Sequence, residues 1–154
     1  MIIRMAQKND IDAVVDLRLN YFCEVYEHFS DDEKALLKNN NISFLHKELG
    51  KTCFVSIAIE NGKVLSSAYM SVYLRAPNRG CSSGAFGEIY GVYTHNDHRG
   101  MGLATKCIKH LMDVAVKKGI KSIKLGASDD GYPLYKKLGF TDEKSGYKQM
   151  IYEG

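Results

Sequence analysis

The sequence predicts an α/β protein with a mixed, mostly antiparallel central sheet and helices on both faces. Three observations predict this class: a hairpin turn signal at Asn61-Gly62 between two apolar runs, amphipathic helical patterns before it, and a strand–helix–strand succession after it. The 154 residues contain no repeat, low-complexity tract or linker. We therefore expect a single domain, residues 1–154.

The first elements are a strand and a helix. Ile2–Met5 is apolar and short, which is typical of a strand. Asn9 or Asp10 can cap a helix that we expect to run to about His28, because apolar residues recur there at helical spacing. The buried stripe of this helix is predicted to be Ile11, Val14, Val15, Leu17, Leu19 and Phe22.

Helical and then extended patterns follow. Ser30 and Glu33 form a capping box, after which Ala35–Leu49 predicts one or two helical pieces that stop at Gly50. The hairpin strands are predicted at Cys53–Ile59 and Val64–Leu74. The stretch that follows is rich in glycine, serine and asparagine. We expect it to be a long, functional loop, Arg75–Gly87.

The second half predicts a right-handed crossover unit. A strand at Glu88–Thr94 leads into a helix at Leu103–Val116, which ends near Lys117, Lys118 and Gly119, and Ser122–Ala127 is the next strand. A short helix, Tyr132–Leu138, begins with Pro133 and is stopped by Gly139. Phe140 and Lys148–Tyr152 are predicted to supply the last strands.

Composition limits the function classes. The net charge is only +3 and the basic residues are scattered, so nucleic-acid binding is not expected. No apolar run approaches the ~20 residues needed to cross a bilayer, and the N-terminal residues do not resemble a signal peptide, which favours a cytoplasmic protein with no membrane partner. The four cysteines lack metal-binding spacing; we expect free thiols and no metal site.

The run Arg99-Gly100-Met101-Gly102-Leu103-Ala104 carries the functional signal. A strand that turns through small residues into a helix leaves backbone N–H groups unpaired at the positive end of the helix dipole. Such a corner binds phosphate, and Arg99 adds a permanent charge. The lysine of a P-loop is missing, and the dinucleotide fingerprint lacks its third glycine, although Asp129 and Asp130 follow the next strand.

A third pattern fits these residues. Arg99-x-x-Gly102-x-Ala104 resembles the Arg/Gln-x-x-Gly-x-Gly/Ala signature of the GNAT superfamily of N-acetyltransferases. The longer segment 92–104 is similar to that family's central strand, turn and cofactor helix. Pro133-Leu134-Tyr135-Lys136-Lys137-Leu138-Gly139-Phe140 is similar to its second hallmark. The resemblance implies a GNAT-like fold.

The resemblance also implies acetyl-CoA as cosubstrate. Its pyrophosphate would lie on the amides of Gly100–Ala104, and its pantetheine arm would pair with Val92–Thr94 like an added strand. In the family, two parallel strands splay apart to admit that arm. A polar contact is expected at Ser128. The implied cofactor-binding residues are Val92, Tyr93, Thr94, Arg99, Gly100, Met101, Gly102, Leu103, Ala104 and Ser128.

Acetyl transfer to an amine needs a base, an oxyanion donor and a group that stabilises the departing thiolate. The resemblance assigns the last task to Tyr135, with Tyr132 as a competitor; both also suit an amphipathic core position. Alternation puts Glu88, Tyr90, Val92 and Thr94 on one strand face. Glu88 is the leading candidate for the base. Alternatively, it binds the amine or is a solvated carboxylate at the strand end, and a chain of water molecules removes the proton. A backbone N–H of Val92 or Tyr93 would face the oxyanion.

The acceptor amine is expected near the first helices and the 75–87 loop. Aromatic rings and carboxylates both suit a cationic amine, and Tyr26 and Glu27 belong to a dense cluster of them. A mixed core-and-surface helix face explains the same residues: Tyr21, Phe22, Glu24, Tyr26, Glu27 and Phe29. The predicted function is that of an N-acetyltransferase acting on a primary amine. A homodimer is one expected oligomeric state. A non-catalytic acetyl-CoA or nucleotide sensor, and a nucleotide-dependent oxidoreductase, are the alternatives.

Overall fold

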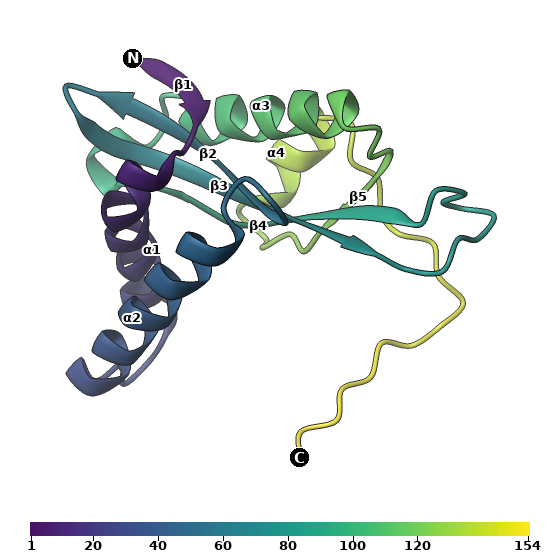
Figure 1. The fold of residues 1–154 in the computed structure, drawn as a ribbon, viewed down its shortest axis with the longest axis horizontal. Helices are drawn as coiled ribbons and strands as arrows, with labels where there is room; N and C mark the ends of the chain where they lie inside the picture. Colours follow the sequence, from purple (N-terminus) through teal and green to yellow (C-terminus); the bar gives the residue numbers. More distant parts are fainter.

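The computed structural model describes all 154 residues as one five-stranded sheet between two pairs of helices (Figure 1). The strands follow the order β1-β2-β3-β4-β5, and every neighbouring pair is antiparallel except β4 and β5, which are parallel. This confirms the predicted mixed, mostly antiparallel sheet. The strands are β1 (Ile2–Met5), β2 (Cys53–Glu60), β3 (Lys63–Leu74), β4 (Ala85–Thr94) and β5 (Ser122–Leu125).

Helices cover both faces of this sheet, as predicted. Helices α1 (Ile11–Val25) and α2 (Asp31–Glu48) pack on one face, and α3 (Leu103–Lys117) with α4 (Tyr132–Lys137) on the other (Figure 1). Two short 3₁₀ turns, η1 (Lys8–Asp10) and η2 (Asn96–His98), precede α1 and α3. No helix is both long enough and apolar enough to cross a bilayer.

The apolar stripe of α1 lies in the core on its side of the sheet. All six predicted positions are buried, because the 3.6-residue period directs them at the sheet together. Asp10, at the N-cap, is 7% exposed. Its carboxylate accepts hydrogen bonds from Arg4 Nη1 at 2.7 Å, Arg4 Nη2 at 3.0 Å and the Gln7 N–H at 2.7 Å. The Asp10 side chain makes no cap hydrogen bond to α1, so the residue predicted to cap the helix instead ties its start to β1.

Several predicted boundaries differ in the first half. Helix α1 ends at Val25 rather than near His28, because Tyr26 is extended and His28 has a φ of +54°. The Ser30–Glu33 capping box is present, and it starts one continuous helix at Asp31. Strand β4 begins at Ala85 rather than Glu88, so the connecting loop is shorter than predicted.

The 75–84 loop connects β3 to β4. The N–H of Arg75 donates to the carbonyl of Gly84 at 2.8 Å, which closes the loop at its base. It projects from the end of β3 and β4 opposite to the end that leads into α3 (Figure 1). The loop does not line the groove described below, and its role at the acceptor site stays a prediction.

The last strands predicted from the sequence are absent. Strand β5 ends at Leu125 rather than Ala127, and neither Phe140 nor the segment 148–152 belongs to a strand. Asp142 and Glu143 still contact Tyr132 and Lys124, and the C-terminal end of the chain then extends away from the body of the protein (Figure 1). A β-prone segment forms a strand only when a partner edge pairs with it. The side chains of Tyr147, Met150, Ile151 and Tyr152 are 84–92% exposed there.

Candidate active site

The two parallel strands separate at one end of the sheet. Pairing between β4 and β5 ends with Ile89 opposite Leu125, while β4 continues to Thr94. Beyond Ile89 this edge of β4 has no neighbouring strand, and a groove of about 900 Å³ lies along it. The groove is lined by Tyr21, Glu24, Val25, the segment 89–94, His98, Arg99, Gly100, Gly102, Leu103, Ala104, Thr105, Gly126, Ser128, Asp130, Leu134 and Tyr135.

A β-bulge interrupts β4 inside this groove. Tyr69 on β3 pairs with Tyr90 and Ser67 pairs with Tyr93, so Gly91 and Val92 together stand opposite one residue of β3. Gly91 takes a φ of +59°, a conformation that favours glycine. Tyr90 packs with the α1-side core, whereas Val92 packs with the α3-side core. The predicted common face for Glu88, Tyr90, Val92 and Thr94 is therefore wrong, because the extra residue reverses the alternation.

The turn into α3 presents free backbone donors to the groove. Gly100 and Gly102 have φ values of +79° and +72°, and a Cβ atom at either position would meet nothing within 4 Å. Gly102 is the N-cap of α3 and supplies no side-chain cap. The N–H groups from Gly100 to Thr105 have no hydrogen-bond acceptor in the protein. Open space, unpaired amides and the positive end of a helix dipole fit an anion such as a diphosphate.

Arg99 does not project freely beside these amides. Its Nη2 donates to Glu24 on α1, with an N–O distance of 2.8 Å, and its Nε donates to the Thr94 carbonyl at 3.1 Å. The Tyr93 hydroxyl donates to the same carboxylate at 2.5 Å. The hydrogen bonds from Tyr93 and Arg99 lower the pKa of Glu24. Burial, followed by the Glu24 carboxylate, raises the pKa of Tyr93 to about 12.

The carboxylate of Glu24 thus joins α1 to the β4–α3 turn at the groove. The sequence analysis grouped Glu24 with its aromatic neighbours but did not assign it to the site. A helical signal was available: Tyr21, Glu24 and Val25 are spaced i, i+3 and i+4, so they share one helix face, and all three line the groove. Tyr90 was likewise placed on the strand face but not assigned to the site, and it too lines the groove.

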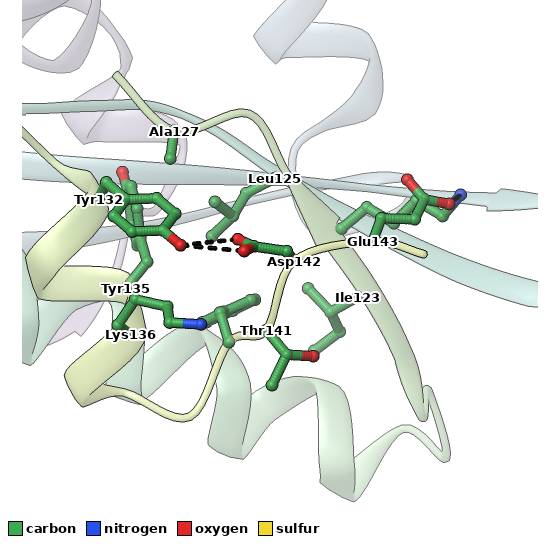
Figure 2. A pocket seen from close by; sticks show the side chains of 11 residues that line it. Ile123, Leu125, Ala127, Tyr132, Tyr135, Lys136, Thr141, Asp142 and Glu143 are labelled. Atoms are coloured by element: carbon green, nitrogen blue, oxygen red, sulfur yellow. Dashed lines mark hydrogen bonds and ion pairs between the residues drawn. The ribbon is translucent and has the colours of Figure 1, made fainter. Parts of the chain in front are cut away.

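Tyr135 and Tyr132 have different environments, although both lie on α4. Tyr135 lines the groove, is half-buried, and its hydroxyl has no hydrogen-bond partner in the protein. Burial, with a smaller contribution from Tyr21, raises its pKa. Tyr132 does not line the groove; it lines a second cavity of about 430 Å³ between β5, α4 and the segment after Phe140, which Tyr135 also borders. Figure 2 shows the Tyr132 hydroxyl directed at Asp142, to which it donates at 2.8 Å.

Most residues predicted to bind the cofactor line the groove. Val92, Tyr93, Thr94, Arg99, Gly100, Gly102, Leu103, Ala104 and Ser128 all do so. The Met101 side chain does not and is 52% exposed. Ser128 is exposed, and its Oγ accepts a hydrogen bond from the Gly131 N–H at 3.2 Å at the start of α4.

The predicted base and acceptor residues lie outside the groove lining. Glu88 is exposed on β4, opposite Ser71 on β3 and Lys124 on β5. Strand alternation puts it on the same side as Tyr90, since the bulge comes after both. Tyr26 and Glu27 line a different cavity of about 490 Å³ between the end of α1 and α2. The structure therefore does not bring these three residues together with Tyr135.

The neighbouring histidines and acids form no metal site. His98 lines the groove, and its Nδ1 is buried without a partner. The Nδ1 of His95 instead accepts from the Asp97 N–H at 3.3 Å and caps the short turn η2. No group of three or more His, Cys, Asp or Glu side chains could hold a metal ion.

Comparison with known proteins matches residues 11–140 to the family model described as Acetyltransferase (GNAT) family. A glucosamine 6-phosphate N-acetyltransferase of Trypanosoma brucei brucei is 28% identical over 100 residues, which are 65% of this chain and 66% of that relative, just under two thirds.

Two solved structures share the fold. A predicted acetyltransferase from Clostridium acetobutylicum, solved with acetyl-CoA, is 28% identical with a TM-score of 0.81, covering 97% of this chain and 95% of that one. Glucosamine-6-phosphate N-acetyltransferase from Arabidopsis thaliana is 20% identical with a TM-score of 0.70, covering 97% of each chain. The likeness to the second is one of fold.

Proposed function

This chain belongs to the acetyltransferase (GNAT) family, whose enzymes use acetyl-CoA, and from that premise we propose that it transfers acetyl directly from acetyl-CoA to a primary amine. The observation that carries the proposal is the open edge of β4 running into unpaired amides at the start of α3. An extended pantetheine arm and a diphosphate need those two features in that order. No comparison supports the non-catalytic sensor.

We assign the cofactor contacts to backbone more than to side chains. The amides of Gly100, Met101, Gly102, Leu103 and Ala104 hold the diphosphate, which is compatible with the outward side chain of Met101 because its N–H is the contact. The backbone of Val92–Thr94 pairs with the pantetheine arm. Ser128 contacts the cofactor from the opposite wall. Arg99 contributes by holding the turn against α1 through Glu24 as well as by its charge.

The chemistry requires one bond to form and one to break. The neutral amine nitrogen attacks the acetyl carbonyl carbon, the carbon–sulfur bond breaks, and a proton leaves the nitrogen. A backbone N–H of Val92 or Tyr93 faces the carbonyl oxygen as it gains charge. Tyr135 donates a hydrogen bond to the departing thiolate; its place in the groove lining and its hydroxyl, which has no other partner in the protein, support this role.

Glu88 is the proposed base. It is too far along the β4 edge to line the groove, so it takes the amine proton through water on the Tyr90 side of the strand. The acceptor therefore approaches from the α1 side of the sheet. Tyr26 and Glu27 contact it only if it is long enough to extend past the end of α1.

We also propose that two copies of the chain form a homodimer through the segment after Phe140. Strand β5 is an edge strand, and the apolar side chains at 147–152 are exposed. Exposed apolar segments and open strand edges favour pairing with another chain. A second copy provides both surfaces at once.

The experiment that tests the proposed function is an assay of thiol release from acetyl-CoA with a panel of primary amines. Glucosamine 6-phosphate is included because the relative from Trypanosoma brucei brucei carries that name. Amine-dependent thiol release and an acetylated product detected by mass spectrometry would support the proposal. Tight acetyl-CoA binding without turnover on any amine would contradict it and favour the sensor.

A further inference from the structure

Arg18 on α1 is a half-buried cation without a carboxylate partner. Its guanidinium carbon lies 4.8 Å from the centroid of the Phe22 ring, 4.9 Å from that of Tyr69 and 5.5 Å from that of Tyr90. Its only hydrogen bond within the protein runs from Nε to Asn41 Oδ1 at 3.0 Å. Arg4 and Arg99, by contrast, pair with Asp10 and Glu24.

The guanidinium lies next to Gly91 of the groove, although Arg18 itself is not one of the residues that line it. A Cβ built on Gly91 would come within 2.5 Å of Arg18 Nη1 and 3.1 Å of the Tyr69 ring. Gly91 and Tyr90 both line the groove, and Tyr21, one helical turn after Arg18, lines it too. Arg18 therefore borders the bulge on the side from which the acceptor approaches.

Most N–H donors of the Arg18 guanidinium have no acceptor within the protein. Aromatic rings orient a guanidinium and attract its charge, but they do not accept its N–H bonds in the way that oxygen does. A partly desolvated cation with most of its donors unpaired is costly unless an acceptor completes it. The buried Tyr69 hydroxyl in the same cluster also lacks a partner. The flat fork of donors matches a carboxylate or a phosphate.

Asn41 on α2 fixes the direction of the fork. Its Oδ1 receives the Arg18 Nε–H, while its own Nδ2 donates to the Leu37 carbonyl at 2.8 Å. This anchor and the three rings leave Nη1 and Nη2 as the unpaired end of the side chain. Pre-organised donors lose little freedom when an anion binds.

We propose that Arg18 binds an anionic group, a carboxylate or a phosphate, carried by the acceptor amine. This inference rests on the proposed function and narrows its acceptor class to compact amines that carry a negative charge. The acceptor is compact because Gly91, which Arg18 contacts, is next in sequence to Val92, where the acetyl group is proposed to lie. Polyamines and other purely cationic amines are excluded by charge repulsion.

The test compares kcat/KM for matched acceptor pairs that differ in the anion. One arm uses α-amino acids against their amides, and the other uses glucosamine 6-phosphate against glucosamine, so the arms separate a carboxylate from a phosphate. Each pair is measured with the wild type, Arg18→Gln, Arg18→Lys and Arg75→Gln. Arg75 is a matched control, because it also stacks on a ring, that of Phe86 at 5.6 Å, but lies at the far end of β4.

In the wild type we expect the anionic member of one pair to be favoured by about tenfold or more, chiefly through KM. Arg18→Gln should abolish that preference, Arg18→Lys should retain part of it, and Arg75→Gln should leave it unchanged. The KM for acetyl-CoA and the melting temperature should stay near wild type in Arg18→Lys, which shows that the fold is intact.

A wild type that turns over amines without favouring either anionic member would overturn the inference and leave the proposed function standing. A preference that survives in Arg18→Gln, or is lost equally in Arg75→Gln, would also overturn it. Absence of thiol release with every amine would overturn the proposed function, and this inference with it.

Discussion

The hydroxyl of Tyr132 donates to both carboxylate oxygens of Asp142, at 2.8 and 3.0 Å, and this contact ties α4 to the segment after it. Both residues line the cavity of about 430 Å³ between β5, α4 and the segment after Phe140, so the contact holds the Tyr132 side chain there (Figure 2). Tyr135, one turn later on the same helix, is left as the α4 tyrosine that lines the groove. The two side chains, which the sequence could not rank by environment, therefore serve as a matched pair for mutation.

Tyr135→Phe should lower kcat with little change in the KM for acetyl-CoA. A hydrogen bond to a charged group contributes about 1.5–3 kcal/mol, so the loss should be about 10- to 100-fold. Steady-state kinetics of thiol release measure both constants. Tyr132→Phe, which removes a hydroxyl bound to Asp142, should keep nearly wild-type kcat. Equal losses in the two variants would remove Tyr135 from the mechanism.

Gly102→Glu should abolish acetyl-CoA binding. Residue 102 holds a φ of +72° at the start of α3, and a carboxylate there would repel a diphosphate and cover the free amides. Isothermal titration calorimetry with acetyl-CoA measures the effect. Gly50→Glu is the control, since Gly50 has a φ of +79°, equally open surroundings and no contact with the groove. Retained affinity in Gly102→Glu would place the diphosphate elsewhere.

Glu88→Gln should reduce kcat/KM by about tenfold or more at neutral pH, because a base supplies at least that factor. The variant keeps the size of the side chain and removes its proton-accepting charge. Glu60→Gln, at the end of β2, is a carboxylate control remote from the groove. An unchanged kcat/KM in Glu88→Gln would mean that water alone removes the proton.

Asp10→Asn should destabilise the protein by about 1–3 kcal/mol at pH 7, as expected for lost charge-assisted hydrogen bonds of a buried carboxylate. The hydrogen bonds from Arg4 lower the pKa of Asp10 in the folded state. A lowered folded-state pKa stabilises the protein above the unfolded value of about 4, and this contribution is lost as the pH falls through the folded-state pKa.

The difference in unfolding free energy between wild type and Asp10→Asn should therefore shrink as the pH falls below about 4. Urea unfolding at several pH values measures it. Asp12→Asn, an exposed acid in the first turn of α1, should cost about 1 kcal/mol or less. A difference that grows at low pH would contradict the assignment of the ion pair.

Replacing Met150, Ile151 and Tyr152 together with serine should convert the proposed dimer into a monomer. The three side chains are the most exposed apolar group at the C-terminal end, and their burial would stabilise an interface. Light scattering coupled to size-exclusion chromatography measures the mass of each form. A monomeric wild type at micromolar concentration would contradict the dimer.

Local patterns predicted the elements whose cause is local. The stripe of α1, the capping box at Ser30 and the turn at Asn61-Gly62 depend on residues near in sequence, and all are present. The segment 148–152 has the composition of a strand but no partner within the chain, and propensity alone could not report that. The 75–84 loop does not line the groove, and its position could not be predicted because strand direction is a long-range property.

The site shows the same division. Gly100, Gly102, Leu103 and Ala104 belong to a local motif, so the sequence predicted them, and all four line the groove. The reversal at Gly91 depends on pairing with β3, and the Glu24–Arg99 ion pair joins residues 75 positions apart. A glycine inside a strand is compatible with a bulge and equally with a packing role, and the ion pair leaves no local signal. Environments as different as those of Tyr132 and Tyr135 follow from packing around α4, which the sequence pattern does not contain.

The bulge at Gly91 places Tyr90 and Val92 on opposite faces of the sheet. Before the bulge, Ile89 packs in the α3-side core and Tyr90 against the α1-side core; after it, Val92 packs against the α3-side core. Substitutions at Tyr90 and at Val92 should therefore be separable in their effects. A library of substitutions confined to the α1-facing positions Glu88 and Tyr90 should change which amine is accepted and leave the proposed diphosphate site intact. Amine specificity and cofactor affinity should therefore be adjustable separately.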